Sequence, residues 1–307
     1  MKWIIDTDPG IDDASAIITA VNSKALDILG ISCVHGNVGL EHTTRNALRL
    51  AELLGKAIPV YSGASRPIMQ KLEHAAEFHG EDGFGNTFMP EPEGRLEKGH
   101  AVDFIIECAK AQEISLLTLG PLTNVALAIA KERSLERRIN HIVMMAGTSR
   151  ARGNTSPVSE FNVFADPEAA AVVFDSGIPI TMVPWETCLD AVLGPETVGK
   201  VRKSSSKAGK AFAQAMELTV ERIKNTLGLE GLLLCDLLAA CVAIDPTVAT
   251  EKVSAKVTVE TGGRFSRGLT VIDERMADGS KPNAFVCLQC DKKKIEGMFL
   301  NAINTKN

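Results

Sequence analysis

The chain begins MKWIIDTDPGIDDASAIITA (residues 1–20), a stretch that joins a short apolar run to four carboxylates. The apolar run at residues 3–5 is typical of a buried strand. Pro9 and Gly10 then predict a turn, and the residues from Asp12 onward predict a helix. The acidic residues therefore follow the carboxyl end of a strand, which is the end at which open α/β sheets bind their ligands.

Apolar runs and amphipathic segments alternate along most of the chain. We expect strands at residues 3–5, 28–34, 58–60, 114–119, 141–145 and 180–183, and helices at residues 41–54, 102–111, 122–130 and 166–174. This alternation is typical of parallel strands joined by helices. Further strands at residues 253–259, 268–271 and 284–290, and a closing helix from residue 291, indicate an extension of the same sheet. The sequence therefore predicts a single α/β domain over residues 1–307, with a mostly parallel, Rossmann-like open sheet and helices on both faces.

Two long segments lack any periodicity, at residues 65–99 and 147–165. Loops of this length in a compact domain are often lids or binding loops. We therefore expect them to carry residues that bind a ligand.

The composition excludes several classes of function. The 307 residues carry a net charge of −5, with 33 basic and 38 acidic residues and no strongly basic stretch, so binding to nucleic acid or to an anionic membrane is not expected. No apolar run reaches the roughly 18 residues that a membrane-spanning helix needs. The seven cysteines and a first residue that leads directly into a strand pattern predict a reduced, cytoplasmic protein.

The crowded carboxylates suggest a metal site. Either Asp12 or Asp13 could cap the predicted helix and interact with its positive end. Capping leaves Asp6 and Asp8 unexplained, because like charges at close range raise one another's pKa unless a cation lies among them. A hard divalent cation explains the cluster better, and ligands that are all oxygen favour Ca²⁺ or Mg²⁺ over zinc. Asp236, flanked by leucines, either caps a helix or supplies a further ligand, since a buried carboxylate needs a partner.

A set of sequence blocks resembles one enzyme family. The blocks are DTDPGIDDA at residues 6–14, HGN at 35–37, FHGEDGFGN at 78–86, LGPLTNVALA at 119–128, EFNVFADPEAA at 160–170 and CDLLAA at 235–240. In this order they resemble the inosine–uridine nucleoside hydrolase family, and together they are far more specific than any one block. The resemblance implies hydrolysis of the N-glycosidic bond of a small-molecule ribonucleoside to ribose and free base, by a homodimer or homotetramer.

The resemblance also implies a role for each matching position. Ca²⁺ would be bound by Asp8, Asp13, Asp236 and the backbone carbonyl of Leu119. Asp8 would also act as general base toward a water that the metal acidifies. Asp12 would hydrogen-bond the ribose 2′-hydroxyl, and Asp6 would orient the metal ligands from behind. The other residues that would bind the substrate are Asn37, His79, Asn154, Glu160, Asn162 and Cys235.

Cys235 is the clearest departure from the family pattern. Well-known members carry a histidine before the late metal aspartate, positioned to protonate the leaving base, and a purine-specific branch carries tryptophan there. A cysteine at this position resembles a third branch. Because an unperturbed thiol has a pKa of about 8.5, Cys235 would be mostly neutral at pH 7. We expect it to contact the base, and whether it acts as an acid stays open.

Two other functions compete with this interpretation. A strand followed by D-x-D also opens haloacid-dehalogenase-type phosphatases, in which Asp6 would be the nucleophile, Asp8 the acid and Mg²⁺ the cofactor. The continuation DPG, in place of D-G-T, argues against that class. The second alternative is a catalytically silent nucleoside-binding protein, and the presence of Asp8, Asp13 and Asp236 together argues against it.

Overall fold

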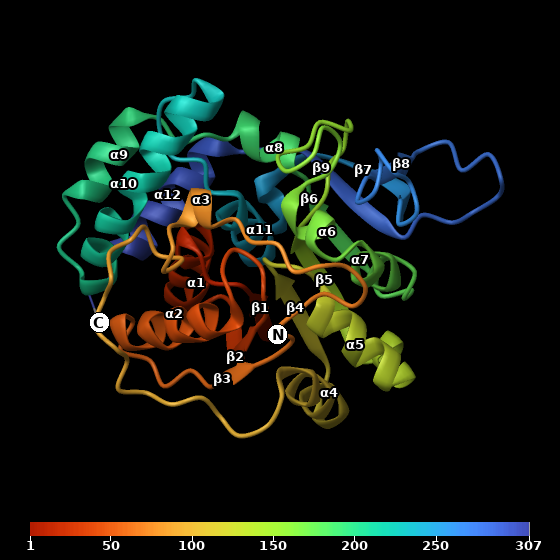
Figure 1. The fold of residues 1–307 in the computed structure, drawn as a ribbon, viewed down its shortest axis with the longest axis horizontal. Coiled ribbons are helices and arrows are strands. Elements are labelled where there is room, and N and C mark those ends of the chain that lie inside the picture. The colour runs from red at the N-terminus through yellow and green to blue at the C-terminus, as the bar shows by residue number, and fades with distance from the viewer. Residues whose placement is uncertain (307) are drawn as a thin grey trace.

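The structure, a computed structural model, describes residues 1–306 and is built around a nine-stranded sheet (Figure 1). The strands are β1 Lys2–Thr7, β2 Asp27–Cys33, β3 Val60–Ser62, β4 Ile114–Thr118, β5 Ile139–Met145, β6 Ile180–Val183, β7 Ala249–Val259, β8 Thr270–Asp273 and β9 Ala284–Cys290. Their order is β3-β2-β1-β4-β5-β6-β9-β7-β8. The pairs from β3 to β9 are parallel, whereas β7 pairs antiparallel with β9 and β8. The predicted mostly parallel, Rossmann-like sheet is confirmed.

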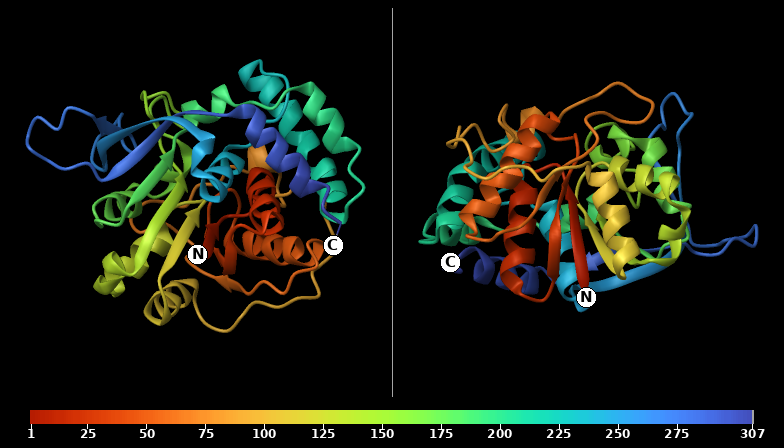
Figure 2. Two further views of the ribbon diagram at one scale, coloured as in Figure 1. Left: turned by 180° about the vertical axis from the view of Figure 1, so that it is seen from behind. Right: turned by 90° about the horizontal axis from the view of Figure 1, so that it is seen from below.

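Helices cover both faces of this sheet (Figures 1 and 2). They are α1 Ile11–Ser23, α2 Leu40–Leu53, α3 Ala76–His79, α4 Ala101–Ala111, α5 Thr123–Lys131, α6 Phe161–Ala165, α7 Pro167–Phe174, α8 Trp185–Asp190, α9 Pro195–Arg202, α10 Lys207–Leu227, α11 Cys235–Ile244 and α12 Lys292–Ile303. Helices α1, α2, α10, α11 and α12 contribute to the core on one face, and α4, α5 and α7 to the core on the other.

Alternate residues of the central strands feed these two cores. Ile5 of β1 and Leu117 of β4 belong to the first core, whereas their neighbours Ile4 and Leu116 belong to the second. All four side chains are fully buried. A continuous apolar run such as Trp3–Ile5 therefore suits a parallel strand that is covered on both faces.

The strand order reverses between β1 and β4, and this reversal positions the site. From β1 the chain runs outward through β2 and β3, then returns to place β4 on the other side of β1. In open sheets of this kind a crevice opens beyond the carboxyl ends of the two strands at the reversal. The register pairs Asp6 with Thr118, so Asp8 and Leu119 both lie just beyond the edge of the sheet.

The structure departs from the expected elements in a few places. Strand β3 covers Val60–Ser62 instead of residues 58–60, because Pro59 has no N–H to contribute to a ladder. Asp236 lies in the first turn of α11, whose N-cap is Leu234, so it does not cap the helix. Helices α8, α9 and α10 were not predicted.

Among the described residues, no helix combines the length and apolarity that a membrane crossing requires.

Candidate active site

Three carboxylates from two helices meet at the reversal point. Asp12 and Asp13 lie in the first turn of α1, and Asp236 lies in the first turn of α11. One oxygen from each lies within 4.8 Å of the others. Because these two helices begin at the same place, their positive dipole ends both face the cluster.

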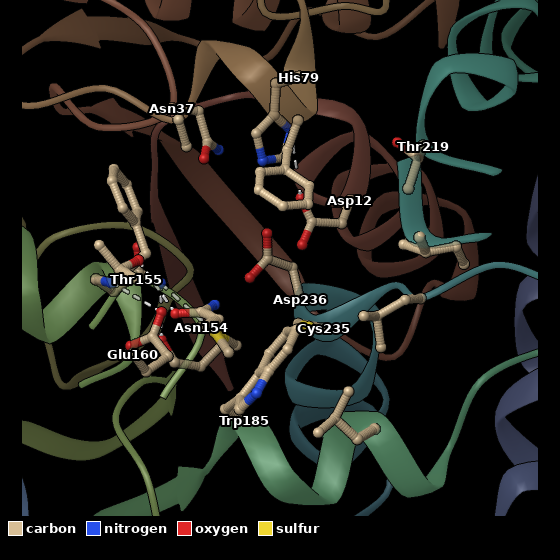
Figure 3. Close-up of a pocket in the computed structure, with 18 of the residues that line it drawn as sticks. Asp12, Asn37, His79, Asn154, Thr155, Glu160, Trp185, Thr219, Cys235 and Asp236 are labelled. Atoms are coloured by element: carbon tan, nitrogen blue, oxygen red, sulfur yellow. Dashed lines mark hydrogen bonds and ion pairs between the residues drawn. The ribbon is translucent and has the colours of Figure 1, made fainter. Parts of the chain in front are cut away.

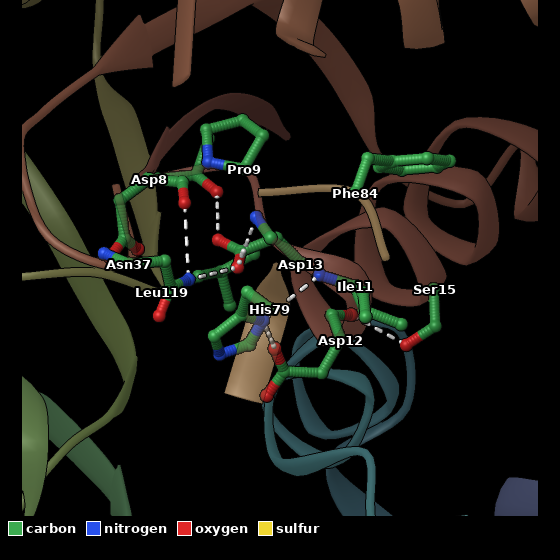
Figure 4. A network of polar contacts seen from close by, with 12 residues as sticks. Asp8, Pro9, Ile11, Asp12, Asp13, Ser15, Asn37, His79, Phe84 and Leu119 are labelled. Carbon is green, nitrogen blue, oxygen red and sulfur yellow. Dashed lines mark hydrogen bonds and ion pairs between the residues drawn. The ribbon is translucent and has the colours of Figure 1, made fainter. Parts of the chain in front are cut away.

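Asp8 lies beside this cluster and is fully buried. Its Oδ2 accepts a hydrogen bond from the Asn37 backbone N–H at 2.7 Å, while Oδ1 has no partner in the described part of the chain. The Asn37 side chain donates to the Asp8 carbonyl at 3.1 Å and to Asp13 Oδ2 at 2.9 Å (Figure 4). Asp13 also accepts from the Thr7 hydroxyl and from the Gly10 N–H. Asn37 therefore ties two of the predicted metal ligands together.

Two glycines allow the backbone to approach Asp8 closely. A Cβ atom at Gly36 or at Gly120 would overlap the Asp8 carboxylate, so any larger residue would displace it. Gly120 follows Leu119, the predicted carbonyl ligand. That carbonyl accepts a hydrogen bond from Asn162 Nδ2 at 2.8 Å, which leaves its second lone pair for a cation.

Burial and mutual repulsion raise the pKa values of these carboxyl groups. Burial raises the pKa of Asp8 well above its usual value, and the charge of Asp13 raises it further. The pKa of Asp236 rises in the same way, through burial and then through the charges of Asp12, Asp13 and Asp8. Burial also raises the pKa of Asp12 to about 6 and that of Asp13 above its ordinary value. Clustered oxygens with one unpartnered atom, on Asp8, fit a hard divalent cation, which would remove the repulsion.

Asp6 lies behind the cluster but its side chain makes other contacts. Its Oδ1 accepts from Ser32 Oγ at 2.5 Å and from Asn124 Nδ2 at 2.9 Å. Burial raises the Asp6 pKa to about 7. Its link to the site runs through the backbone, where its carbonyl accepts from the Leu119 N–H at 2.8 Å. Asp6 therefore holds β1, β2 and α5 together beneath the site.

His79 reaches the cluster from α3. Its Nδ1 accepts a hydrogen bond from the Ile11 N–H at 3.2 Å and lies 3.8 Å from Asp12 Oδ1. Burial lowers the His79 pKa to about 4, so the imidazole is neutral at pH 7. Because Nδ1 accepts, we assign the ring proton to Nε2. His79 thus offers a neutral donor to the pocket (Figure 3).

A pocket of about 440 Å³ opens above these residues (Figure 3). One end is polar and is lined by Asn37, Asn154, Thr155, Glu160 and Asn162. At the other end Thr219 comes from α10 (Figure 3), and this helix also lines the pocket with Ile223, Thr226 and Leu227. Phe78, Trp185, Leu189, Leu233 and Cys235 complete its largely apolar lining. Asp12, Asp236 and Leu119 also line the pocket, whereas Asp8 and Asp13 are buried beneath it. The fold thus brings every sequence-predicted site residue except Asp6 to the pocket or directly under it.

Glu160 and Asn162 fix the polar end. Glu160 accepts from the N–H groups of Asn162 and Gly147, each at 2.7 Å, and so caps α6. Burial raises the Glu160 pKa to about 7. Asn162 donates to the carbonyls of Leu119 and Met145, at 2.8 and 3.0 Å. Asn154 is exposed at the pocket rim, and its side-chain Oδ1 accepts from the hydroxyl of its neighbour Thr155 at 3.2 Å.

Cys235 lies at the apolar end, 6% exposed. The neighbouring Cys188 thiol, together with burial, raises the pKa of Cys235 well above its usual value. Cys188 Sγ lies 3.4 Å from the Pro184 carbonyl. The Cys235 thiol is therefore neutral at physiological pH.

Helix α10 supplies pocket residues that were not predicted from the sequence. Thr219, Ile223, Thr226 and Leu227 all face the pocket from this helix. The residues at its two ends could have predicted its boundaries. Ser206 caps the helix by accepting from the Gly209 N–H at 2.8 Å, and Gly228 ends it with φ +66°. Serine before a helix and glycine after it are typical boundary residues.

Comparison with known proteins gives a consistent result. Residues 3–296 match the family described as inosine-uridine preferring nucleoside hydrolase. The pyrimidine-specific ribonucleoside hydrolase RihA of Salmonella enteritidis is 36% identical over 294 residues, which is 94% of each chain. Among solved structures, a plant nucleoside hydrolase is 28% identical with a TM-score of 0.94 over 99% of each chain. A purine-preferring ribonucleoside hydrolase from Gardnerella vaginalis is 31% identical with a TM-score of 0.93, over 99% of this chain and 98% of that one.

Proposed function

The chain belongs to the inosine-uridine preferring nucleoside hydrolase family, and we propose that its carboxylate cluster binds Ca²⁺ and acts on a ribonucleoside held in the pocket above. The protein is a ribonucleoside hydrolase, and cleavage of the N-glycosidic bond gives ribose and free base. The observation that carries the proposal is the unpartnered Asp8 Oδ1 beside the clustered oxygens of Asp12, Asp13 and Asp236.

Four groups would hold the cation: the carboxylates of Asp8, Asp13 and Asp236 and the carbonyl of Leu119. Ca²⁺ suits them better than Mg²⁺, because it accepts six to eight oxygens in flexible geometry whereas Mg²⁺ demands a near-ideal octahedron. Ligand sites would then remain for two ribose hydroxyls. When bound, the ion supplies positive charge and makes water at the site more acidic.

Residues around the cation site have separate roles in the proposed hydrolysis. Asp8 accepts a proton from the attacking water and so acts as general base. Asp12 accepts a hydrogen bond from the ribose 2′-hydroxyl. Positive charge develops on the sugar in the oxocarbenium-like transition state, and the carboxylates around the ribose stabilise that charge. His79 donates a hydrogen bond to the bound nucleoside from Nε2.

We propose that ribose occupies the polar end of the pocket and the base the apolar end. Asn37, Asn154, Glu160 and Asn162 supply donors and acceptors that match sugar hydroxyls. The base end is walled mainly by apolar groups such as Trp185 and Ile223, and an apolar wall discriminates weakly between ligands. The relatives include a pyrimidine-specific and a purine-preferring hydrolase. We therefore propose that both purine and pyrimidine ribonucleosides are substrates.

Three further properties are part of this proposal. The seven cysteines are all unpaired in the described chain, which supports a reducing, cytoplasmic location. Strands from both ends of the chain share one sheet, which supports one domain over residues 1–307. The family resemblance supports a homodimer or homotetramer, which light scattering would test.

Two chromogenic substrates separate this function from its rivals. We expect release of p-nitrophenol from p-nitrophenyl riboside and none from p-nitrophenyl phosphate. Release from the phosphate alone would indicate a phosphatase, and release from neither would indicate a silent binding protein. A reducing-sugar assay with inosine, adenosine, uridine and cytidine then gives the base preference. A Ca²⁺-selective chelator should abolish turnover and added Ca²⁺ should restore it; recovery with Mg²⁺ alone would contradict the choice of metal.

A further inference from the structure

Glu186 makes an unusual set of contacts with the loop that borders the polar end of the pocket. This residue follows Trp185 in α8 and is 8% exposed. Its Oε2 accepts from the Ser149 N–H at 2.8 Å, and its Oε1 accepts from the N–H groups of Arg150 and Arg152 at 2.7 and 3.3 Å. Ser149 Oγ lies 3.2 Å from Oε2 and adds a fourth hydrogen bond. One buried carboxylate thus receives three backbone amides from four consecutive loop residues.

These hydrogen bonds bracket a strained residue. Ala151 has φ +54°, a left-handed conformation that is unfavourable for a residue with a Cβ atom. Such a residue keeps this conformation only where the surrounding contacts impose it. The N–H groups on either side of Ala151 both donate to the same oxygen of Glu186, which resembles the way successive amides enclose an anion. Glu186 therefore supplies the contacts that stabilise this turn.

The same loop continues directly to the pocket rim. Arg152, Gly153, Asn154 and Thr155 all line the pocket. Beyond the turn, the Asn154 N–H donates to the carbonyl of Ser159 at 3.2 Å, a buried residue whose hydroxyl donates to the Arg267 carbonyl at 2.7 Å. The Asn154 side chain is exposed, so its position follows from how the two ends of this loop are held. The direction in which its amide points depends on the turn that Glu186 holds.

We propose that Glu186 is a positioning residue for the ribose end of the site, because its carboxylate fixes the loop that presents Asn154. This inference rests on the proposed function, in which Asn154 binds the sugar. Glu186 touches neither substrate nor metal in this scheme. Trp185 and Glu186 are adjacent, so one turn of α8 supplies a wall at the base end and the anchor of the loop at the ribose end.

Glu186→Gln tests the inference with little change in size. A glutamine has one acceptor oxygen where glutamate has two, so it cannot accept both from the Ser149 N–H and from the N–H groups of Arg150 and Arg152. We expect KM for inosine and uridine to rise about five- to twenty-fold, with a smaller change in kcat. Inhibition by D-ribose should weaken by a similar factor, whereas inhibition by free base should not change. Glu132→Gln is the matched control, because Glu132 also accepts a backbone N–H, from Ser134, at the far end of α5 from the site.

The loop itself offers a readout that does not depend on activity. Arg150 and Arg152 are exposed, and trypsin cleaves after arginine. Glu186→Gln should accelerate cleavage after these two residues, mapped by mass spectrometry, and Glu132→Gln should not. If Glu186→Gln fails to fold, Glu186→Asp keeps the charge but shortens the reach, and it should give the same rise in KM and the same faster cleavage.

A double-mutant cycle separates this inference from the proposed function. Asn154→Ala should raise KM and weaken ribose inhibition, and adding Glu186→Gln to it should change neither further. Full additivity, or a Glu186→Gln enzyme with normal KM and normal cleavage, would overturn the positioning role alone. If Asn154→Ala leaves KM and ribose inhibition unchanged, the sugar-binding role of Asn154 is wrong, and the positioning role is wrong with it.

Discussion

The side-chain amide of Asn37 donates a hydrogen bond to the Asp13 carboxylate at 2.9 Å. The two residues come from different parts of the fold, since Asp13 lies in α1 and Asn37 follows β2. The Asn37 backbone N–H also donates to Asp8. A single residue outside the proposed ligand set therefore orients two members of it.

Replacing Asn37 with alanine should weaken Ca²⁺ binding. Removal of a group that orients metal ligands costs about 10- to 100-fold in metal affinity. We expect the Ca²⁺ concentration for half-maximal turnover to rise by that factor in Asn37→Ala, and calorimetric titration should show the same loss. Asn140→Ala removes an exposed amide that contacts Glu113, and it should leave Ca²⁺ binding unchanged. Normal Ca²⁺ affinity in Asn37→Ala would contradict the arrangement.

Replacing Asp8 with asparagine should affect activity and stability in opposite directions. Asp8→Asn removes the proposed base and one ligand, so turnover on every nucleoside should fall by at least about 100-fold. The same change removes a buried charge that Asp13 opposes. We therefore expect a higher Tm than that of the wild type when both are heated with chelator at pH 8. A lower Tm with retained turnover would contradict both roles.

The stability of the metal-free protein should fall as pH rises. Burial raises the pKa values of Asp6 and Glu160 to about 7 and that of Asp12 to about 6. A carboxyl group with a raised folded pKa binds its proton more tightly in the folded protein than in the unfolded chain. Between the two pKa values the unfolded chain has released this proton and the folded protein still holds it. Raising the pH through this range therefore lowers the free energy of unfolding. With chelator present, Tm should drop by several degrees between pH 5 and pH 8.

Calcium provides the control for this pH dependence. Bound cation stabilises the ionised carboxylates and favours the folded state. Scanning calorimetry with saturating Ca²⁺ should therefore show a flatter or reversed trend over the same range. A metal-free Tm that rises with pH would contradict the raised pKa values of these buried carboxyl groups.

The first residues of the chain predicted both the start of the sheet and the location of the site. This was possible because the strand, the turn and the helix start are local patterns, and because ligands bind at the carboxyl ends of parallel strands. The hydrogen bonds from Asn37 to Asp8 and Asp13 could not be predicted, since they depend on how two loops meet in space. The position of β9 between β6 and β7 also depends on packing between distant segments.

Helix α10 was not predicted, for a different reason. Its buried residues, among them Ala208, Phe212 and Ala215, recur at helical spacing between charged ones, a pattern typical of an amphipathic helix that was not recognised. The capping residues Ser206 and Gly228 indicate where the helix begins and ends, but they do not indicate that Thr219 and Ile223 face the pocket. That placement comes from packing against α1, α2 and α9.

Cys235 should influence which base is preferred without acting as an acid. The neighbouring Cys188 thiol and burial raise its pKa well above the usual value, so it stays neutral and donates weakly at pH 7. It lines the apolar end of the pocket with Trp185. Cys235→Ala opens space beside the base, so kcat/KM should fall several-fold and the ranking of inosine, adenosine, uridine and cytidine should change. The pH–rate profile should keep its shape, because no titrating group has been removed.

The matched control for this prediction is Cys287→Ala, which changes a buried cysteine on β9 outside the pocket and should leave the ranking of nucleosides intact. If Cys235→Ala leaves rate and ranking unchanged across the four nucleosides, the residue only fills space. Loss of one limb of the pH profile would instead identify the thiol as an acid.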